Sequence, residues 1–140
     1  MNPPFTTTRR VEFRDTDAAG IMHFSVFFTA MESAEHEFLR SVGLGILFED
    51  KGVHLSFPRV AAKCDYQSPV KFGDEYQIEV RIARIGTKSV TYEFLFSHEA
   101  RAVARGEITA VCCRFDDAGK PISVPIPDWA LRCLRGETPT

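Results

Sequence analysis

The chain has 140 residues, of which 44% are hydrophobic and 26% are charged, close to the averages of globular proteins. At this length about two thirds of the unfolded surface can be buried, so we expect one folded domain and no disordered or fibrous chain. The formal net charge of -2 excludes a general attraction to nucleic acid, and an anionic ligand would need a local group of basic residues.

The sequence carries no sign of secretion or of a membrane span. Residues 1–10 lack the apolar core of a signal peptide, and no later window approaches the roughly 18 apolar residues that cross a bilayer. The four cysteines are too sparse for a disulfide scaffold and lack CxxC spacing. We therefore expect a cytoplasmic protein, with no membrane partner, whose reduced cysteines pack in the interior. They are Cys64, Cys112, Cys113 and Cys133.

The first predicted elements are a short strand and a long helix. Residues 8–13 alternate as a strand does and lead into an acidic segment that ends at Gly20. From Ser25 to Val42 apolar residues recur every three or four positions, as on the buried face of a helix. Ser25 has the side chain of an N-cap, and Gly43 is typical of a residue that ends a helix. The apolar face contains Phe24, Phe27, Phe28, Met31, Ala34, Phe38, Leu39 and Val42.

The second half of the chain reads as strands. After the less regular residues 44–53, apolar and polar residues alternate with period two, which is typical of strands. Residues 116–120 indicate a hairpin turn, and residues 129–134 indicate one or two helical turns. The alternating runs are 59–66, 76–82 and 90–96, and a fourth run covers 103–115.

The links between these runs set the topology. Residues 85–87 and 98–101 are too few for a parallel crossover, so consecutive strands should be antiparallel. We therefore predict an α+β domain in which one long helix packs on a single curved antiparallel sheet.

The acidic segment between the first strand and the helix carries the most specific pattern. Residues 11–24, VEFRDTDAAGIMHF, followed at once by the amphipathic helix, resemble the signature of hot-dog-fold thioesterases of the 4-hydroxybenzoyl-CoA thioesterase family. The turn at 68–70, the pair Gly73-Asp74 and the strand start at 88–90 also have equivalents in that family. The resemblance implies one hot-dog domain over residues 1–140 that hydrolyses an acyl-CoA to free acid and coenzyme A, with no metal or other cofactor.

The resemblance also implies a role for particular residues. Asp17 would be the catalytic carboxylate, either as nucleophile on the thioester carbon or as base for a water. The backbone N–H groups of Phe24 and Ser25 would polarise the thioester carbonyl. That role has an independent physical reason, because free N–H groups and the dipole at a helix start stabilise negative charge on oxygen. Gly20 would let the chain turn into the helix beside the substrate.

Other interpretations of the acidic segment are weaker. Aspartates in turns are frequently only acceptors for nearby N–H groups, and we interpret Asp15 in this way. The order Asp15-x-Asp17-x-x-Gly20 also opens a calcium-binding EF-hand loop, but Ala19 and Val26 stand where that loop needs oxygen ligands, so calcium is excluded. An Asp-x-Asp magnesium site for phosphoryl transfer lacks the further elements that such enzymes need.

Further side chains are candidates for the acyl pocket. Glu35 falls within the apolar face of the predicted helix and Glu32 at its margin, and a carboxylate there is costly unless it is paired or faces a ligand. Phe28 would suit an aromatic or a fatty acyl group. A second group of hot-dog thioesterases uses a helical Glu as catalyst, which leaves Glu32 as an alternative to Asp17. His23 stands where the family usually has an aromatic residue, so it either packs and contacts substrate or moves a proton.

Coenzyme A is polyanionic, so basic residues should meet its phosphates. Lys88 lies where the family commonly binds them, although Gly86 and Thr87 replace positions that can be basic in relatives. Arg59 is a second candidate. The family pairs its subunits, so we expect a homo-oligomer, a dimer or a tetramer formed as a dimer of dimers, with the active site at the junction. The alternatives are a 1,4-dihydroxy-2-naphthoyl-CoA hydrolase and a non-catalytic acyl-CoA-binding module.

Overall fold

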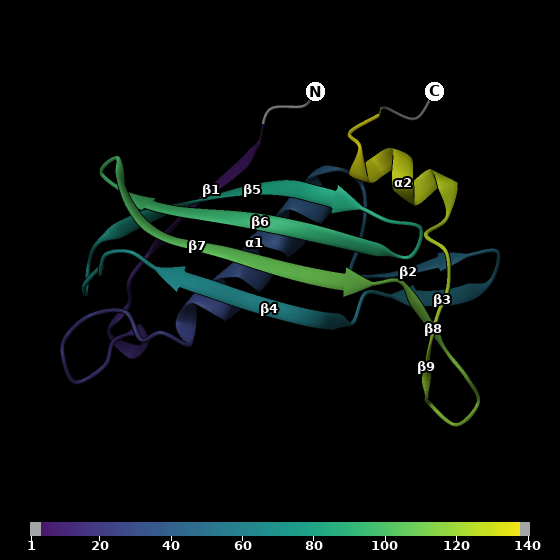
Figure 1. Ribbon diagram of the computed structural model, residues 1–140, viewed down its shortest axis with the longest axis horizontal. Helices are drawn as coiled ribbons and strands as arrows, with labels where there is room; N and C mark the ends of the chain where they lie inside the picture. The colour runs from purple at the N-terminus through teal and green to yellow at the C-terminus, as the bar shows by residue number, and fades with distance from the viewer. Residues whose placement is uncertain (1–3, 138–140) are drawn as a thin grey trace.

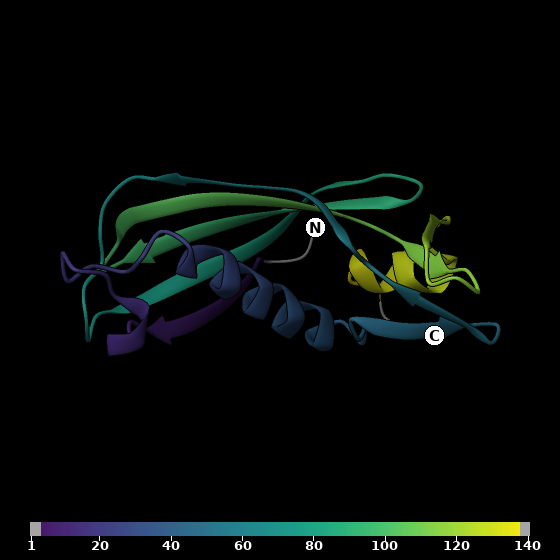
Figure 2. The same cartoon turned by 90° about the horizontal axis from the view of Figure 1, so that it is seen from below.

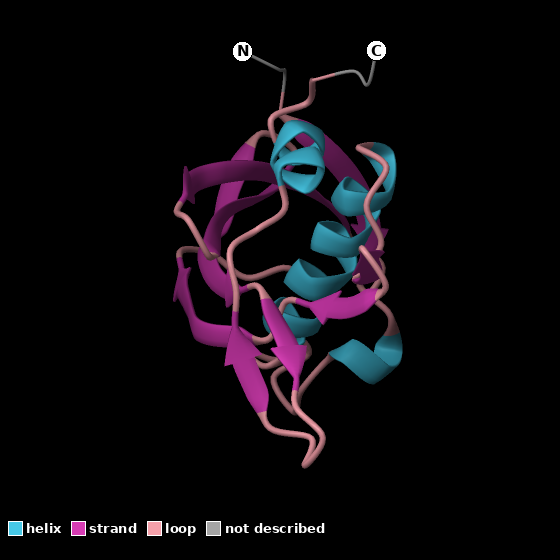
Figure 3. Ribbon diagram, turned by 90° about the vertical axis from the view of Figure 1, so that its right-hand side faces the viewer, coloured by secondary structure: helices cyan, strands magenta, loops and turns pink. Residues whose placement is uncertain are grey.

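A five-stranded antiparallel sheet curves around one long helix in the computed structural model, which describes residues 4–137 (Figures 1 and 2). The strand order is β1-β5-β6-β7-β4, so β1 and β4 are the edge strands. Viewed from the end, the curved sheet wraps around one side of α1 (Figure 3). The predicted hot-dog α+β fold is confirmed. The elements are β1 Phe5–Arg10, α1 Val26–Ser41, β4 Arg59–Tyr66, β5 Glu75–Ile85, β6 Ser89–His98 and β7 Arg101–Val111.

A smaller sheet closes the end of the molecule at which α1 stops (Figure 1). Its strand order is β2-β3-β8-β9, and the terminal helix α2 lies beside it. The predicted hairpin at 116–120 is confirmed, because the Asp116 carboxylate accepts the N–H groups of Ala118 and Lys120 at 2.9 and 2.8 Å. The elements are β2 Leu47–Asp50, β3 Val53–Ser56, β8 Cys113–Phe115, β9 Pro121–Ser123 and α2 Asp128–Leu134.

Helix α1 follows the prediction closely. It begins at Val26 and ends at Ser41, and Gly43 follows with a φ of +88°, which favours glycine. One close contact of the helix with the sheet lies at β7, where a Cβ on Gly106 would overlap Cε of the fully buried Met31. A side chain at this crossing would therefore force the end of the Met31 side chain to move. The buried residues of α1 are Phe27, Ala30, Met31, Ala34, Glu35 and Leu39.

Two predicted strands have different bounds in the structure. The first strand covers Phe5–Arg10 rather than 8–13, and Phe13–Asp15 forms a short 3-10 helix, η1. The fourth run divides at Cys112, whose N–H donates to the Lys88 carbonyl at 2.7 Å, so that β7 and β8 join different sheets. The β2–β3 hairpin was not predicted, because residues 44–53 show no clear period.

The cysteines are free, with Cys112 and Cys113 buried and the other two partly buried. This agrees with the prediction of reduced packing residues. Neither α1 nor α2 has the length and apolar character required to cross a membrane.

Candidate active site

The acidic segment folds back on itself between β1 and α1. The Asp15 carboxylate accepts the N–H of Glu12 at 2.9 Å and caps η1, which supports its structural interpretation. Two backbone bonds then close the loop, from the Asp17 N–H to the Ile21 carbonyl at 3.0 Å and from the Gly20 N–H to the Asp17 carbonyl at 2.9 Å. Gly20 has a φ of +81°, which side chains rarely adopt. The local sequence thus fixes the backbone on which Asp17 is carried.

The Asp17 side chain is partly exposed and lines a cavity of about 350 Å³. One carboxylate oxygen, Oδ1, accepts the N–H of Ala19 at 2.8 Å, which leaves Oδ2 available to a substrate or a water. Most of the cavity wall is apolar, as in sites that take small organic ligands. The lining residues are Asp17, Ile21, Met22, Phe24, Phe27, Tyr66, Gln67, Ser68 and Pro69.

The two predicted oxyanion donors differ in the structure. Within residues 4–137 the Phe24 N–H has no hydrogen-bond acceptor, and Phe24 lines the cavity with Asp17. The Ser25 N–H donates instead to Nδ1 of His23 at 3.2 Å, so it is not free. Ser25 is also not the predicted side-chain cap, because its backbone is already helical and its hydroxyl lies 2.7 Å from the same His23 nitrogen. Of the two predicted donors, the free one is the N–H of Phe24.

The ring of His23 contacts the two residues that follow it in the chain. An N–H can only donate, so the contact from Ser25 makes Nδ1 an acceptor, and the neutral ring then carries its proton on Nε2. The ring stacks on Phe24, with 4.5 Å between centroids. His23 does not line the cavity, and this arrangement supports the packing interpretation over proton transfer.

The other predicted pocket residues lie away from this cavity. Glu35 is 1% exposed and pairs with Nη2 of Arg59 at 2.5 Å. Burial raises the pKa of Glu35 to about 7, although Arg59 acts in the opposite direction. Glu32 points outward, 4.0 Å from Arg59, and Phe28 packs partly buried against the core. Gly20 and Ser25 are exposed outside the cavity lining as well.

The two predicted phosphate contacts also have different settings. The guanidinium of Arg59 is engaged by Glu35 and by the Phe57 carbonyl at 2.7 Å, so Arg59 is poorly suited to the phosphate role that we expected. Lys88 is exposed in the β5–β6 turn, at the opposite end of the sheet from the Asp17 loop (Figure 1). Its phosphate role stays a prediction.

The sequence did not single out the far wall of the cavity. Tyr66 is the last residue of β4, and the turn that follows it carries Gln67, Ser68 and Pro69 to the start of α1. The hydroxyl of Tyr66 donates to the Phe24 carbonyl at 2.9 Å. Nothing in the period-two pattern of β4 identifies this contact, because it depends on where the end of an edge strand meets the helix. The 68–70 turn of the family resemblance was the available signal.

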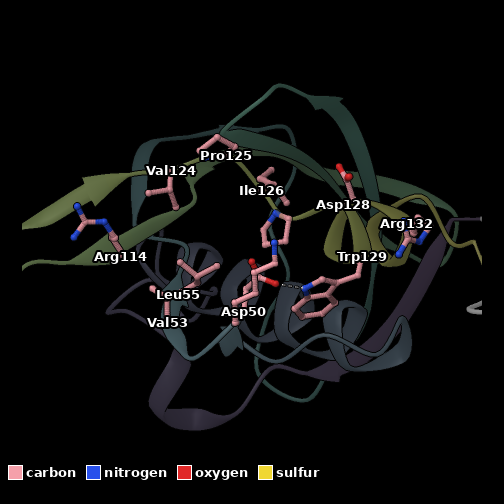
Figure 4. Close-up of a pocket in the computed structure, with 12 residues that line it drawn as sticks. Asp50, Val53, Leu55, Arg114, Val124, Pro125, Ile126, Asp128, Trp129 and Arg132 are labelled. Atoms are coloured by element: carbon pink, nitrogen blue, oxygen red, sulfur yellow. Dashed lines mark hydrogen bonds between the residues drawn. The ribbon is translucent and has the colours of Figure 1, made fainter.

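A larger cavity of about 670 Å³ lies at the other end of the molecule, between the β2–β3 hairpin and α2 (Figure 4). The indole N–H of Trp129 donates to Asp50 Oδ1 across it, at 2.9 Å. Its wall mixes three basic side chains with two acidic ones and contains none of the predicted catalytic residues. The charged lining residues are Lys51, Arg114, Arg132, Asp50 and Asp128.

Comparison with known proteins agrees with this geometry. The model of the thioesterase-like superfamily matches residues 11–134. A 1,4-dihydroxy-2-naphthoyl-CoA hydrolase of Nostoc punctiforme is 33% identical over 134 residues, which cover 93% of this chain and 86% of that protein. The structure of a gentisyl-coenzyme A thioesterase superposes with a TM-score of 0.78 at 30% identity and covers 91% of this chain and 99% of the other.

A third comparison extends the agreement in fold. The crystal structure of a 1,4-dihydroxy-2-naphthoyl-CoA thioesterase from Synechocystis superposes with a TM-score of 0.81 at 24% identity, covering 95% of this chain and 96% of the other. The region matched by the family model contains the Asp17 loop, α1 and the strands β4, β5, β6 and β7 of the main sheet. The chain therefore belongs to the thioesterase-like superfamily and is a hot-dog-fold thioester hydrolase.

Proposed function

We propose that the protein hydrolyses the coenzyme A thioester of a hydroxylated aromatic acid, with Asp17 as the catalytic carboxylate. The observation that carries the proposal is that one mostly apolar cavity is lined by Asp17 and by Phe24, whose N–H has no acceptor among the described residues. Rings of Phe24, Phe27 and Tyr66 line the same space, which suits a planar acyl group. Two of the relatives that are at least 30% identical are named for dihydroxylated aromatic acyl groups, gentisyl and 1,4-dihydroxy-2-naphthoyl.

The chemistry follows from these two groups. Attack on the thioester carbon places negative charge on the carbonyl oxygen, and an N–H at the helix start stabilises that charge. Asp17 either attacks the carbon itself, forming an anhydride and releasing the coenzyme A thiolate, or takes a proton from a water that attacks. Hydrolysis of the anhydride or collapse of the water adduct yields the same acid.

Subunit pairing is part of the proposal. Strand β4 is an edge of the main sheet, so one row of its backbone N–H and C=O groups lacks a strand partner among the described residues. Val60 on this strand is 63% exposed, so its apolar side chain is available to a partner strand. We expect a homodimer or a dimer of dimers that covers this edge.

A substrate panel tests the function. Wild-type protein is assayed with gentisyl-, 1,4-dihydroxy-2-naphthoyl- and 4-hydroxybenzoyl-CoA, and with short and long fatty acyl-CoAs, by release of the coenzyme A thiol. The proposal expects the highest kcat/KM for one of the hydroxylated aromatic substrates. A preference for a fatty acyl group would reject the substrate class, and tight binding of every thioester without turnover would favour a non-catalytic acyl-CoA-binding module.

A further inference from the structure

The free N–H of Phe24 lies between two anchored groups. On one side, the carbonyl of His23, which shares a peptide plane with this N–H, accepts the N–H of Val26 at 3.0 Å. On the other side, the carbonyl of Phe24 accepts the hydroxyl of Tyr66 at 2.9 Å. The first anchor is a backbone contact, whereas the second comes from a side chain. Of these two anchors on the backbone around the Phe24 N–H, the one from Tyr66 can be removed by substitution.

The helix itself does not use the Phe24 carbonyl. The N–H of Phe28, which would reach it in a regular helical turn, donates to Ser25 at 3.2 Å instead. Within residues 4–137 the Phe24 carbonyl accepts its hydrogen bond from the Tyr66 hydroxyl. The hydroxyl thus satisfies a carbonyl that has no hydrogen bond within α1. It also joins the end of β4 to the start of α1, which lie close together in Figure 1.

The contacts of the Tyr66 ring and the pKa of its phenol both favour a hydroxyl that donates from a fixed position. Its ring packs edge-on against Phe27, with 5.1 Å between centroids and an angle of 82°, and Phe27 is only 4% exposed. Desolvation raises the pKa of the Tyr66 phenol above its ordinary value, and Cys64 acts in the same direction, so the hydroxyl keeps its proton. The ring lines the cavity while the hydroxyl is turned to the backbone.

We propose that Tyr66 is a positioning residue for thioester hydrolysis: its hydroxyl holds the Phe24 carbonyl so that the N–H of Phe24 faces the thioester oxygen. This inference rests on the proposed function, in which that N–H stabilises the charge formed during attack. A preorganised donor acts on the transition state more than on the bound substrate, so losing its orientation lowers kcat and leaves KM nearly unchanged.

The experiment compares Tyr66→Phe, which keeps the ring, with Tyr66→Leu, which removes both ring and hydroxyl. With the best substrate of the panel, Tyr66→Phe is expected to lower kcat roughly tenfold, with KM and the affinity for a thioether analogue of that substrate within about twofold of wild type. Tyr66→Leu should lower kcat and also raise KM, because the cavity wall is lost. Tyr92→Phe is the matched control, since the buried Tyr92 hydroxyl has no hydrogen-bond partner among the described residues.

Three results would overturn the assignment. A kcat of Tyr66→Phe equal to that of Tyr92→Phe would show that the hydroxyl has no part in the reaction. A loss confined to KM would make Tyr66 a wall of the cavity only, and a fall in melting temperature in step with kcat would make it a structural residue. Failure of wild-type protein to turn over any CoA thioester would instead reject the proposed function, and with it the role of Tyr66.

Discussion

Glu35 shows at the scale of a single residue how burial and charge compete. Its carboxylate is 1% exposed and pairs with Arg59, yet Oε1 has no hydrogen-bond partner among the described residues. Burial outweighs the ion pair and raises the pKa of Glu35 from 4.5 to about 7. The sequence pattern placed Glu35 on the buried face of α1, but it could not distinguish a core ion pair from a ligand contact, because Arg59 lies 24 residues away.

This pKa predicts how stability depends on pH. The folded protein binds the Glu35 proton more tightly than the unfolded chain does. The stability that this proton contributes is therefore lost as pH rises from 4.5 to about 7, and the unfolding free energy no longer depends on Glu35 protonation above that range. The loss amounts to about 3 kcal/mol. Urea unfolding of wild type and Glu35→Gln, measured from pH 4.5 to 8, should show the difference in unfolding free energy falling by this amount with rising pH.

The comparison with Glu35→Gln removes the other titrations. His36, whose pKa is lowered by burial and by Arg59, is present in both proteins and largely cancels. Two stability curves that run parallel across the whole pH range would contradict the assignment of this dependence to Glu35.

At the scale of elements, α1 crosses β7 where the buried side chain of Met31 lies against Gly106. The helical periodicity was sufficient to predict α1 to within one residue at each end, because its buried face repeats over four turns. The β2–β3 hairpin and the break at Cys112 could not be predicted, since each depends on pairing with strands distant in the chain. Cys113, for example, pairs with Ser56 of β3. Phe24 was wrongly assigned to the buried face: it precedes the helix, and its side chain is 63% exposed.

The crossing gives a prediction for a pair of substitutions. Gly106→Ala places a methyl group against the buried side chain of Met31 and should cost about 1–3 kcal/mol of unfolding free energy. Met31→Ala alone should cost about 2–5 kcal/mol through the cavity that it leaves. Because the second change makes room for the first, the double variant should lose clearly less than the sum, by about 1 kcal/mol or more. Additive losses in urea unfolding would show that the two side chains do not meet.

For the whole molecule, the open edge at β4 predicts the oligomeric state. Sedimentation of wild-type protein should give the mass of a dimer or tetramer, and Val60→Lys should shift it toward the 15.8 kDa chain by placing a charge at that edge. Val53→Lys, at a 42% exposed position of the β2–β3 hairpin, is the matched control. A mass that is the same for wild type and Val60→Lys would exclude this edge as the contact.

The proposed catalytic site also belongs to this scale, because it joins parts of the chain that are far apart. The family resemblance selected Asp17 and the N–H of Phe24, since both lie within one continuous segment, and their catalytic roles stay predictions. Tyr66 and the turn after it come from the end of β4, and Ser25 and Arg59 differ from expectation because nearby side chains occupy their polar groups. Local patterns do not contain such contacts.

Replacing Asp17 by Asn is the most direct test of the proposal that this carboxylate is catalytic. The amide keeps the size of the side chain but can neither attack the thioester nor accept a proton from water, so kcat should fall at least about 100-fold while a thioether substrate analogue still binds. Asp65→Asn, an exposed change beside Tyr66 but outside the cavity lining, is the control and should retain wild-type turnover. Folded Asp17→Asn protein that hydrolyses the best CoA thioester at the wild-type rate would contradict the assignment of Asp17 as the catalytic carboxylate.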